Sequence, residues 1–165
     1  MAGVANNAVG KTVQLLAETG TLSSNIARIS DSQGIPLAPI TAAQIVTGNV
    51  SFDIAERSGD VKYSSIYVYC EKISNSLKEK FRSFSGKILL VIEVRVSQDR
   101  LQALEAKLQL YVEAITQVLN ESRGDWGQGL FYTGGYEVIF GAVKHGGRNF
   151  IKIAKVSFEV EASVN

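Results

Sequence analysis

The hydrophobic pattern of the chain is strongest between Lys87 and Asn120, where an alternating segment passes directly into a helical one. From Ile88 to Val96, apolar residues recur at every second position, which predicts a strand with one apolar face. Beyond Ser97 the apolar positions recur every three to four residues, which predicts a long helix of about six turns. The apolar stripe of this helix consists of Leu101, Leu104, Leu108, Tyr111, Val112, Ile115, Val118 and Leu119. We expect the rest of the chain to pack against this strand and helix.

Two shorter helices are expected before this pair, over residues 3–19 and 21–30, because both segments carry apolar residues at helical spacing. A loop follows that holds both prolines of the chain, since proline cannot continue a helix. We therefore predict that residues 1–47 form an N-terminal helical arm with a proline-containing loop. Residues 48–165 are predicted to form the main α+β domain.

The remaining strands are expected where short segments alternate, over 50–57, 65–72, 135–143 and 149–161. Residues 73–86 fit either a short helix or a long hairpin arm. The segment SRGDWGQGLFYTGG holds five glycines in fourteen residues, which predicts an irregular loop. These elements predict an α+β fold, with a mostly antiparallel sheet of about four to five strands, one long helix packed on a face and additional N-terminal helices.

Charge and cysteine content narrow the possible functions. The chain has 17 Lys+Arg and 16 Asp+Glu among 165 residues, which argues against a broad basic face for nucleic acid. A single cysteine allows no intramolecular disulfide and fits a reducing compartment. No apolar run approaches the ~20 residues of a membrane span, and the N-terminus lacks a signal-peptide pattern. We expect a protein made in the cytoplasm that does not contact membranes.

No catalytic or cofactor-binding constellation is recognisable in the sequence. Residues 5–12, ANNAVGKT, fit a relaxed phosphate-loop pattern, but too few residues precede them for the buried strand that this motif requires. His145 is the only histidine, so no histidine-based metal site is expected. Cys70 alternates with apolar strand residues and is predicted to lie in the core. We therefore expect no enzymatic activity, no metal and no cofactor.

Charged residues near the end of the central strand are the first candidates for a subunit interface. Glu93 and Arg95 share a strand face that begins apolar, and Arg100 lies just beyond. In a monomer these side chains would be solvated or paired with each other. In an oligomer they are placed to bridge subunits.

Trp126 is the second interface candidate, because it lies in the glycine-rich segment, where Arg123 and Asp125 precede it and are expected to frame it. A loop tryptophan is either a plug tucked into the core or an anchor in an interface, where Trp, Tyr and Arg dominate the binding energy. The sequence leaves both alternatives open. His145 and Arg148 lie in the predicted turn before the last strand and complete the set of candidate interface residues.

Three blocks of the chain, in this order and spacing, resemble a known family. They are IYVYCEKISNSLKEKFRSFSG (66–86), IEVRVSQDRLQALEAKLQLYVEAITQVL (92–119) and GGYEVIFGAVKHGGRNFIKIAKVSFEVE (134–161). This pattern is similar to that of tail-terminator or head–tail neck proteins of tailed bacteriophages. The resemblance covers roughly the last hundred residues, and none of its motifs is catalytic.

The resemblance implies a structural virion protein that assembles as a homo-oligomer, a hexameric ring. Such a ring caps the tail tube, ends its polymerisation and docks the tail to the head. The implied partners are the tail tube protein and the head–tail connector protein, with the tail sheath as a further candidate. DNA would pass through the lumen without sequence-specific binding. The implied location is the tail–neck junction of the virion, after assembly in the host cytoplasm.

Two other functions stay open at this point. One is another head-to-tail connector, such as a stopper, adaptor or neck protein. It would also assemble as a ring but would contact different neighbouring proteins. A small-molecule-binding α+β domain would instead use the glycine-rich segment, and it would need a pocket with convergent polar groups.

Overall fold

The computed structural model of the chain describes residues 3–18, 20–59, 62–146 and 148–165. Its elements, in chain order, are α1 (Val4–Ala17), α2 (Leu22–Gln33), the 3-10 turn η1 (Ala42–Gln44), β1 (Ile45–Thr47), α3 (Phe52–Ser58), β2 (Ser65–Asn75), β3 (Phe84–Gln98), α4 (Leu104–Glu121), β4 (Gly124–Gly127), β5 (Leu130–Tyr132), β6 (Glu137–Phe140), β7 (Lys144–Gly146) and β8 (Asn149–Val164). The fold is α+β, as the sequence predicts.

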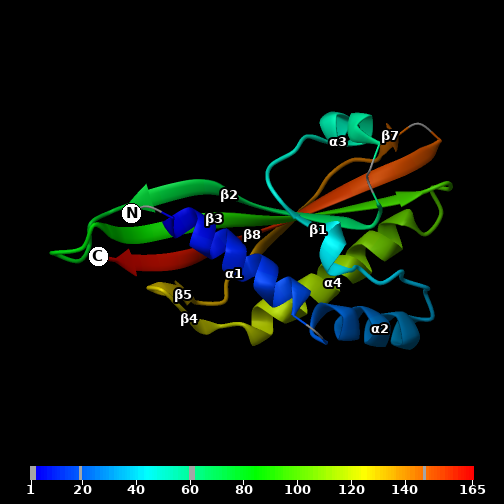
Figure 1. The fold of residues 1–165 in the computed structure, drawn as a ribbon. Helices are drawn as coiled ribbons and strands as arrows, with labels where there is room; N and C mark the ends of the chain where they lie inside the picture. Colours follow the sequence, from blue (N-terminus) through cyan, green and yellow to red (C-terminus); the bar gives the residue numbers. More distant parts are fainter. Residues whose placement is uncertain (1–2, 19, 60–61, 147) are drawn as a thin grey trace.

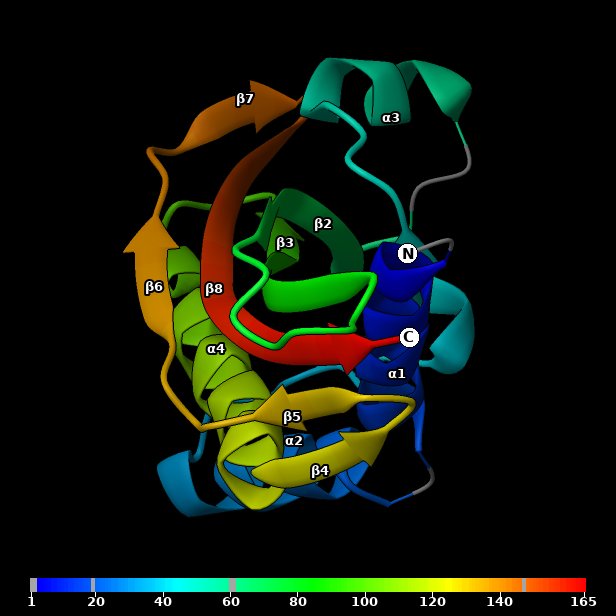
Figure 2. The same ribbon diagram turned by 90° about the vertical axis from the view of Figure 1, so that its left-hand side faces the viewer.

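One curled sheet holds the molecule together, in the order β1-β2-β3-β8-β5-β4, and β6 and β7 also pair with β8. β1 runs parallel to β2, and every other pair of the described strands is antiparallel. β3 and β8 are paired along fifteen residues, from Phe84 opposite Val164 to Gln98 opposite Phe150. Figure 2 shows β8 bending through the sheet, so that its two ends reach opposite sides of the molecule.

The hydrophobic core lies between this sheet and the helices α1, α2 and α4, which gather on one side of it (Figures 1 and 2). The predicted apolar face of β3 is confirmed, because Ile88, Leu90, Ile92 and Val94 are fully buried. α4 presents the predicted stripe to the sheet from Leu104 onward. α1 and α2 contribute Val4, Ala8, Leu16, Leu22, Ile26 and Ile29 to the same core. The predicted division of the chain at residues 47 and 48 stays a prediction.

Three details of the predicted fold are wrong. The sheet has eight strands among the described residues, instead of four to five, because short strands add to β8 along its length. Residues 52–58 form helix α3, which ends at Gly59 in the left-handed conformation, where a strand is expected. α4 begins at Leu104 and leaves Leu101 exposed, because Ala103 adopts a left-handed conformation that a continuous helix cannot accommodate.

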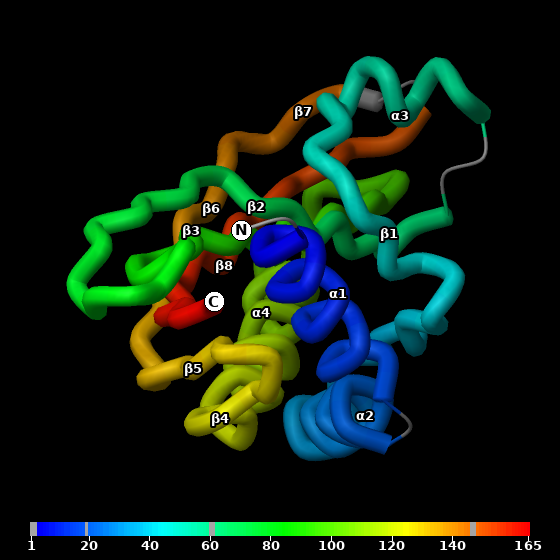
Figure 3. Tube along the Cα trace, turned by 60° about the vertical axis from the view of Figure 1, so that its left-hand side comes forward, coloured from blue at the N-terminus to red at the C-terminus, as the bar shows by residue number. Residues whose placement is uncertain are grey.

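The glycine-rich segment is also more regular than predicted, because it contains the β4–β5 hairpin. Gln128 and Gly129 have positive φ at the turn between these strands, so glycine here closes a hairpin. Of the two alternatives for residues 73–86, the structure contains the long hairpin, formed by the ends of β2 and β3. We call residues 73–86 the arm. The start of α1 and the end of β8 lie at the same end of the molecule as the arm (Figures 1 and 3).

Candidate functional site

A cluster of charged and aromatic side chains lies on the sheet face that points away from the core. The strand register brings the cluster together, since Glu93 on β3 is opposite both Tyr67 on β2 and Lys155 on β8. Arg95 follows Glu93 by two positions, so both side chains emerge on the same face. We call Tyr67, Tyr69, Glu93, Arg95 and Lys155 the charged cluster.

Glu93 is the acceptor at the centre of the charged cluster. Its carboxylate accepts a hydrogen bond from Arg95 Nε at 2.7 Å and forms an ion pair with Arg95 Nη2 at 2.5 Å. Lys155 Nζ lies 3.7 Å from the other carboxylate oxygen, and the Tyr69 hydroxyl donates to that oxygen at 3.5 Å. Burial and the neighbouring Glu93 carboxylate raise the pKa of Tyr69 to about 12, so this hydroxyl keeps its proton.

The Glu93–Arg95 pair is buried within the subunit, with relative exposures of 5% and 2%. The Arg95 guanidinium lies over the Tyr67 ring, 4.0 Å from its centre, and Arg95 Nη2 also donates to the carbonyl of Val50. Among the described residues, however, Arg95 Nη1 has no hydrogen-bond partner. A buried donor without an acceptor costs free energy.

A cavity of about 590 Å³ opens over the charged cluster. Three parts of the chain surround it, namely the sheet, the segment that leads into α3 and the connection between β6 and β7. Its lining residues are Asn49, Val50, Ser51, Phe52, Glu71, Glu93, Arg95, Ile139, Gly141, Ala142, Lys144, Ile153, Lys155 and Ser157. The lining thus combines charged groups on the sheet with apolar groups on the covering segments.

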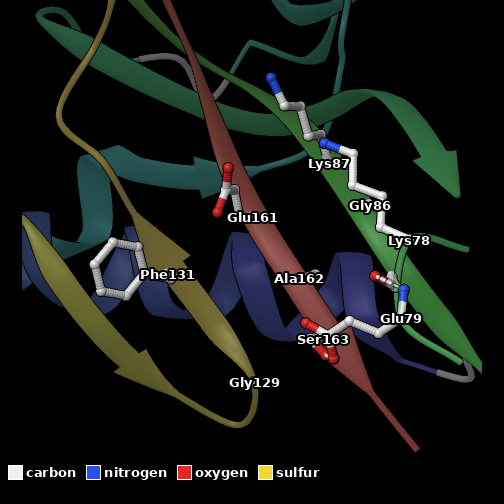
Figure 4. Close-up of a pocket in the computed structure, with 10 residues that line it drawn as sticks. Lys78, Glu79, Gly86, Lys87, Gly129, Phe131, Glu161, Ala162 and Ser163 are labelled. Atoms are coloured by element: carbon white, nitrogen blue, oxygen red, sulfur yellow. Dashed lines mark hydrogen bonds between the residues drawn. The ribbon is translucent and has the colours of Figure 1, made fainter. Parts of the chain in front are cut away.

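A second, smaller pocket of about 260 Å³ lies between the arm and the β5 and β8 strands. Figure 4 shows Lys78, Glu79 and Lys87 on the arm side of the pocket, with Glu161 on β8 and Phe131 on β5. The hydroxyl of Ser163 donates to the Glu79 carboxylate at 2.7 Å. The four charged residues that line this pocket, Lys78, Glu79, Lys87 and Glu161, are all exposed.

The tip of the arm exposes apolar side chains to solvent. Phe81 is 98% exposed and Leu77 is 59% exposed, and both residues have positive φ. Lys78, Lys80 and Arg82 lie around them in the sequence. The arm therefore carries exposed apolar and positively charged side chains at its tip.

The predicted interface residues lie in four separate places. Glu93 and Arg95 lie together in the charged cluster and are paired with each other, which is one of the two arrangements predicted for a monomer. Arg100 is exposed in the connection between β3 and α4. The residues in the other two places are Arg123, Asp125, Trp126, His145 and Arg148. Whether any of the eight contacts another subunit stays a prediction.

Trp126 is tucked into the protein. Its indole Nε1 donates to the carbonyl of Ser122 at 2.7 Å, and its ring lies 5.5 Å from that of Tyr132 and 6.1 Å from that of Phe158. Arg123 and Asp125, which precede Trp126 in the sequence, are both exposed. Of the two alternatives, this arrangement favours a tryptophan that packs into the core over one that anchors an interface.

His145 and Arg148 are exposed in the hairpin of β7 and β8, on the side of the molecule that carries α3 (Figure 2). The His145 ring meets the Phe150 ring edge to face at 5.6 Å. Cys70, predicted to lie in the core, is partly buried and packs against it.

Sequence reasoning missed Lys155, the cavity and the exposed Phe81. The alternation of β8 places Lys155 on the polar face, but only its register with β3 shows that it faces Glu93. The signal for Phe81 was ambiguous, because its four-residue spacing from Leu77 and Ile73 also fits the apolar stripe of a short helix.

Two further observations bear on chemistry. Within the part of the chain that the structure describes, no three His, Cys, Asp or Glu side chains are grouped so as to hold a metal ion. None of the described helices is both long and apolar enough to cross a membrane.

Comparison with known proteins gives a likeness in structure. No protein-family model matches the chain, and no curated protein matches its sequence. Among solved structures, the chain is similar to one from the "Virion of native gene transfer agent (GTA) particle", with a TM-score of 0.50 and 12% sequence identity. The match covers 96% of this chain and 95% of that chain. At this identity the likeness shows a shared fold.

Proposed function

We propose that this chain is a structural protein of a tailed, phage-like virion, in which it forms a ring at the tail–neck junction and acts as the tail terminator. The observation that carries the proposal is the likeness of fold to a chain of a gene transfer agent virion, over nearly the full length of both chains. The resemblance in sequence pattern, over roughly the last hundred residues, points to the same class of protein.

The shape of the subunit supports assembly with copies of itself. The arm and the α3–β7 region lie at opposite ends of the molecule (Figure 1). Two different surfaces that face away from each other form a heterologous contact, and repeated heterologous contacts close into a ring when the rotation allows it. The exposed Phe81 would serve as an anchor of such a contact.

The first test of this proposal is the mass of the assembled protein. Light scattering on purified protein, alone and with tail tube protein, is expected to give six times the 17.9 kDa subunit mass. Electron microscopy of the same sample should show closed rings. A monomer under all conditions, with no binding to tube ends, would refute the proposal.

A deletion experiment separates the terminator from other connectors. Without a terminator the tube continues to polymerise, so loss of the gene should give overlong tails on particles examined by electron microscopy. Heads that leak DNA while tails keep normal length would instead identify a stopper or adaptor.

A further inference from the structure

Strand β6 has one free edge. It pairs with β8 alone, and Figure 2 shows it at the outer flank of the sheet. The Gly141 N–H donates to the carbonyl of Ile153 at 2.8 Å, which continues the β6–β8 pairing. Because backbone groups of an antiparallel pair alternate in direction, the N–H and C=O groups of Val138 and Phe140 point away from β8. Among the described residues, none hydrogen-bonds to these groups.

The free edge of β6 lacks the features that usually protect such edges. Natural proteins block edges with lysine, proline or a bulge, and residues 136–143 contain neither lysine nor proline. The β6–β8 pairing also shows no shift of register, whereas the β4–β5 pairing at the far edge of the sheet does. An unprotected apolar edge is suited to accept a further strand.

The arm offers a second free edge. β1 covers the outer side of β2 only as far as Val68. Past the irregularity in the β2–β3 pairing, the Ser76 N–H donates to the carbonyl of Ser85 at 3.0 Å. The backbone groups of Ile73 and Asn75 therefore point away from β3. None of the described residues hydrogen-bonds to these outward groups either.

The two edges match in apolar surface and in charge. Seven of the eleven large apolar side chains that are exposed in the described structure lie in these two segments, namely Ile73, Leu77 and Phe81 on the arm and Tyr136, Ile139, Phe140 and Val143 on or beside β6. Glu137 on β6 forms no ion pair with any described residue, and neither do Lys78 and Lys80 on the arm. The arm thus carries unpaired cations, and β6 carries an unpaired anion.

We propose that the arm of one copy of the chain adds to β6 of the next copy as a further antiparallel strand. Ile73 pairs with Phe140 and Asn75 pairs with Val138, so that backbone hydrogen bonds satisfy the outward groups of both strands. This alignment brings Glu137 against the beginning of the loop that carries Lys78 and Lys80. The inference rests on the proposed function, since it names the two surfaces that meet in the ring.

Charge complementarity favours the arm over a second β6 as the added strand. A β6–β6 contact would be isologous and would close after two copies. It would also leave Glu137 without a cation. The contact between arm and β6 uses two different surfaces, so each copy keeps one of them free for the next copy.

Proline substitutions test the contact on the full chain. Ile73→Pro and Phe140→Pro each remove an outward N–H, and an edge strand tolerates proline where the lost donor faces away from the sheet. We expect each variant to associate at least about tenfold more weakly than the parent in sedimentation velocity. Ile73→Val and Phe140→Leu, which keep the N–H, are the matched controls and should retain most of the association.

A mixture of the two proline variants tests which surfaces meet. The Ile73→Pro copy keeps an intact β6, and the Phe140→Pro copy keeps an intact arm. A 1:1 mixture should therefore form a heterodimer of twice the 17.9 kDa subunit mass, although neither variant associates alone. If the mixture forms no heterodimer, or if Ile73→Pro alone still dimerises through β6, the inference is overturned.

Charge variants decide the question if a proline variant does not fold. Glu137→Lys and Lys78→Glu should each weaken association several-fold, because each places like charges together. The double variant with both changes in one chain should recover it, since every contact then pairs the exchanged charges. Failure of the double variant to associate better than the single variants would overturn the inference.

The same measurements separate this inference from the proposed function. Rings that persist in both proline variants overturn the inference and leave the proposed function standing. A parent that forms open chains instead of rings, and loses them in both proline variants, supports the inference and counts against the proposed function. A parent that stays monomeric, alone and with tail tube protein, overturns both.

Discussion

At the scale of single residues, the Glu93–Arg95 pair determines the character of the polar sheet face. Folding removes the water around both charged groups. Two short contacts between the side chains, and the contact of Arg95 with the ring of Tyr67, offset the cost of this desolvation. A buried ion pair of this kind adds little net stability, but removal of one partner leaves an uncompensated charge. Its effect on stability is therefore large for single substitutions and small for a paired replacement.

We predict that Arg95→Met alone lowers the free energy of unfolding by about 3–5 kcal/mol, because Glu93 is then buried without its partner. The Arg95→Met/Glu93→Gln double variant should recover most of this loss, since no buried charge is left unpaired. Urea denaturation followed by circular dichroism measures both values. If the single variant is as stable as the parent, the pair is not buried as described.

The raised pKa values of two buried tyrosines predict how stability depends on pH. Burial raises the pKa of Tyr69 and of Tyr132 to about 12, from the usual 10.0. Between these pH values the unfolded chain releases protons that the folded chain retains, so stability falls as the pH rises.

Urea midpoints measured from about pH 9 to about pH 12 should therefore decrease steadily. Tyr69→Phe removes one of the tyrosines with a raised pKa and should show a shallower decrease than the parent, which separates this effect from lysine deprotonation in the same range. Equal slopes for the two proteins would show that Tyr69 ionises alike in the folded and unfolded states.

At the scale of elements, the arm depends on close contact between the backbones of β2 and β3. Gly86 lies opposite Asn75, and a Cβ atom at Gly86 would meet the carbonyl oxygen of Ser74. The backbone is rigid here because both strands are paired, so the clash cannot be relieved by a side-chain rotation. Glycine is required at this position because there is no room for a Cβ atom, and its φ angle does not require glycine.

Gly86→Ala is expected to destabilise the protein by about 1–3 kcal/mol, the usual cost of overpacking. Gly10→Ala is the matched control, because Gly10 lies inside α1 with no atom within 4 Å of an added Cβ. Alanine there should stabilise the protein by up to about 1 kcal/mol. Urea denaturation of both variants measures the difference, and the same sign for both would contradict this account.

At the scale of the whole molecule, β8 connects two different ends. Its first residues pair with β7 near α3, and its last residues pair with β3 at the base of the arm. Pro36 and Pro39 lie in the loop between α2 and η1, so they interrupt none of the described strands. A subunit with two unlike ends is suited to head-to-tail assembly.

Phe81→Ser tests the arm as an assembly contact. Because the Phe81 side chain is exposed and does not pack against the core, the free energy of unfolding should change by less than about 0.5 kcal/mol. The fraction of protein in rings, measured by analytical ultracentrifugation, should drop sharply. Val46→Ser, at an exposed apolar position on β1 and outside both proposed contact surfaces, is the control for general loss of apolar surface. Equal effects of the two substitutions would show that the arm has no special role.

Much of the core could be predicted, whereas the site could be predicted only in part. The alternation from Ile88 to Val96 and the stripe from Leu104 to Leu119 identify buried residues, because burial follows local periodicity. The same alternation predicts that Glu93 and Arg95 share a face. It does not tell whether water or protein covers that face. Segments distant in sequence, around Val50 and Ile139, decide this.

The sequence by itself determined the fold class, the central strand and helix, and the two N-terminal helices, because each follows from a periodicity of two or of about 3.6 residues within a single segment. Only the tertiary structure decided the eight-stranded sheet, the helical state of 52–58, the exposed arm and the buried charged cluster. These features depend on which strands β8 pairs with and in which register, and such long-range pairing leaves no signal in the local pattern.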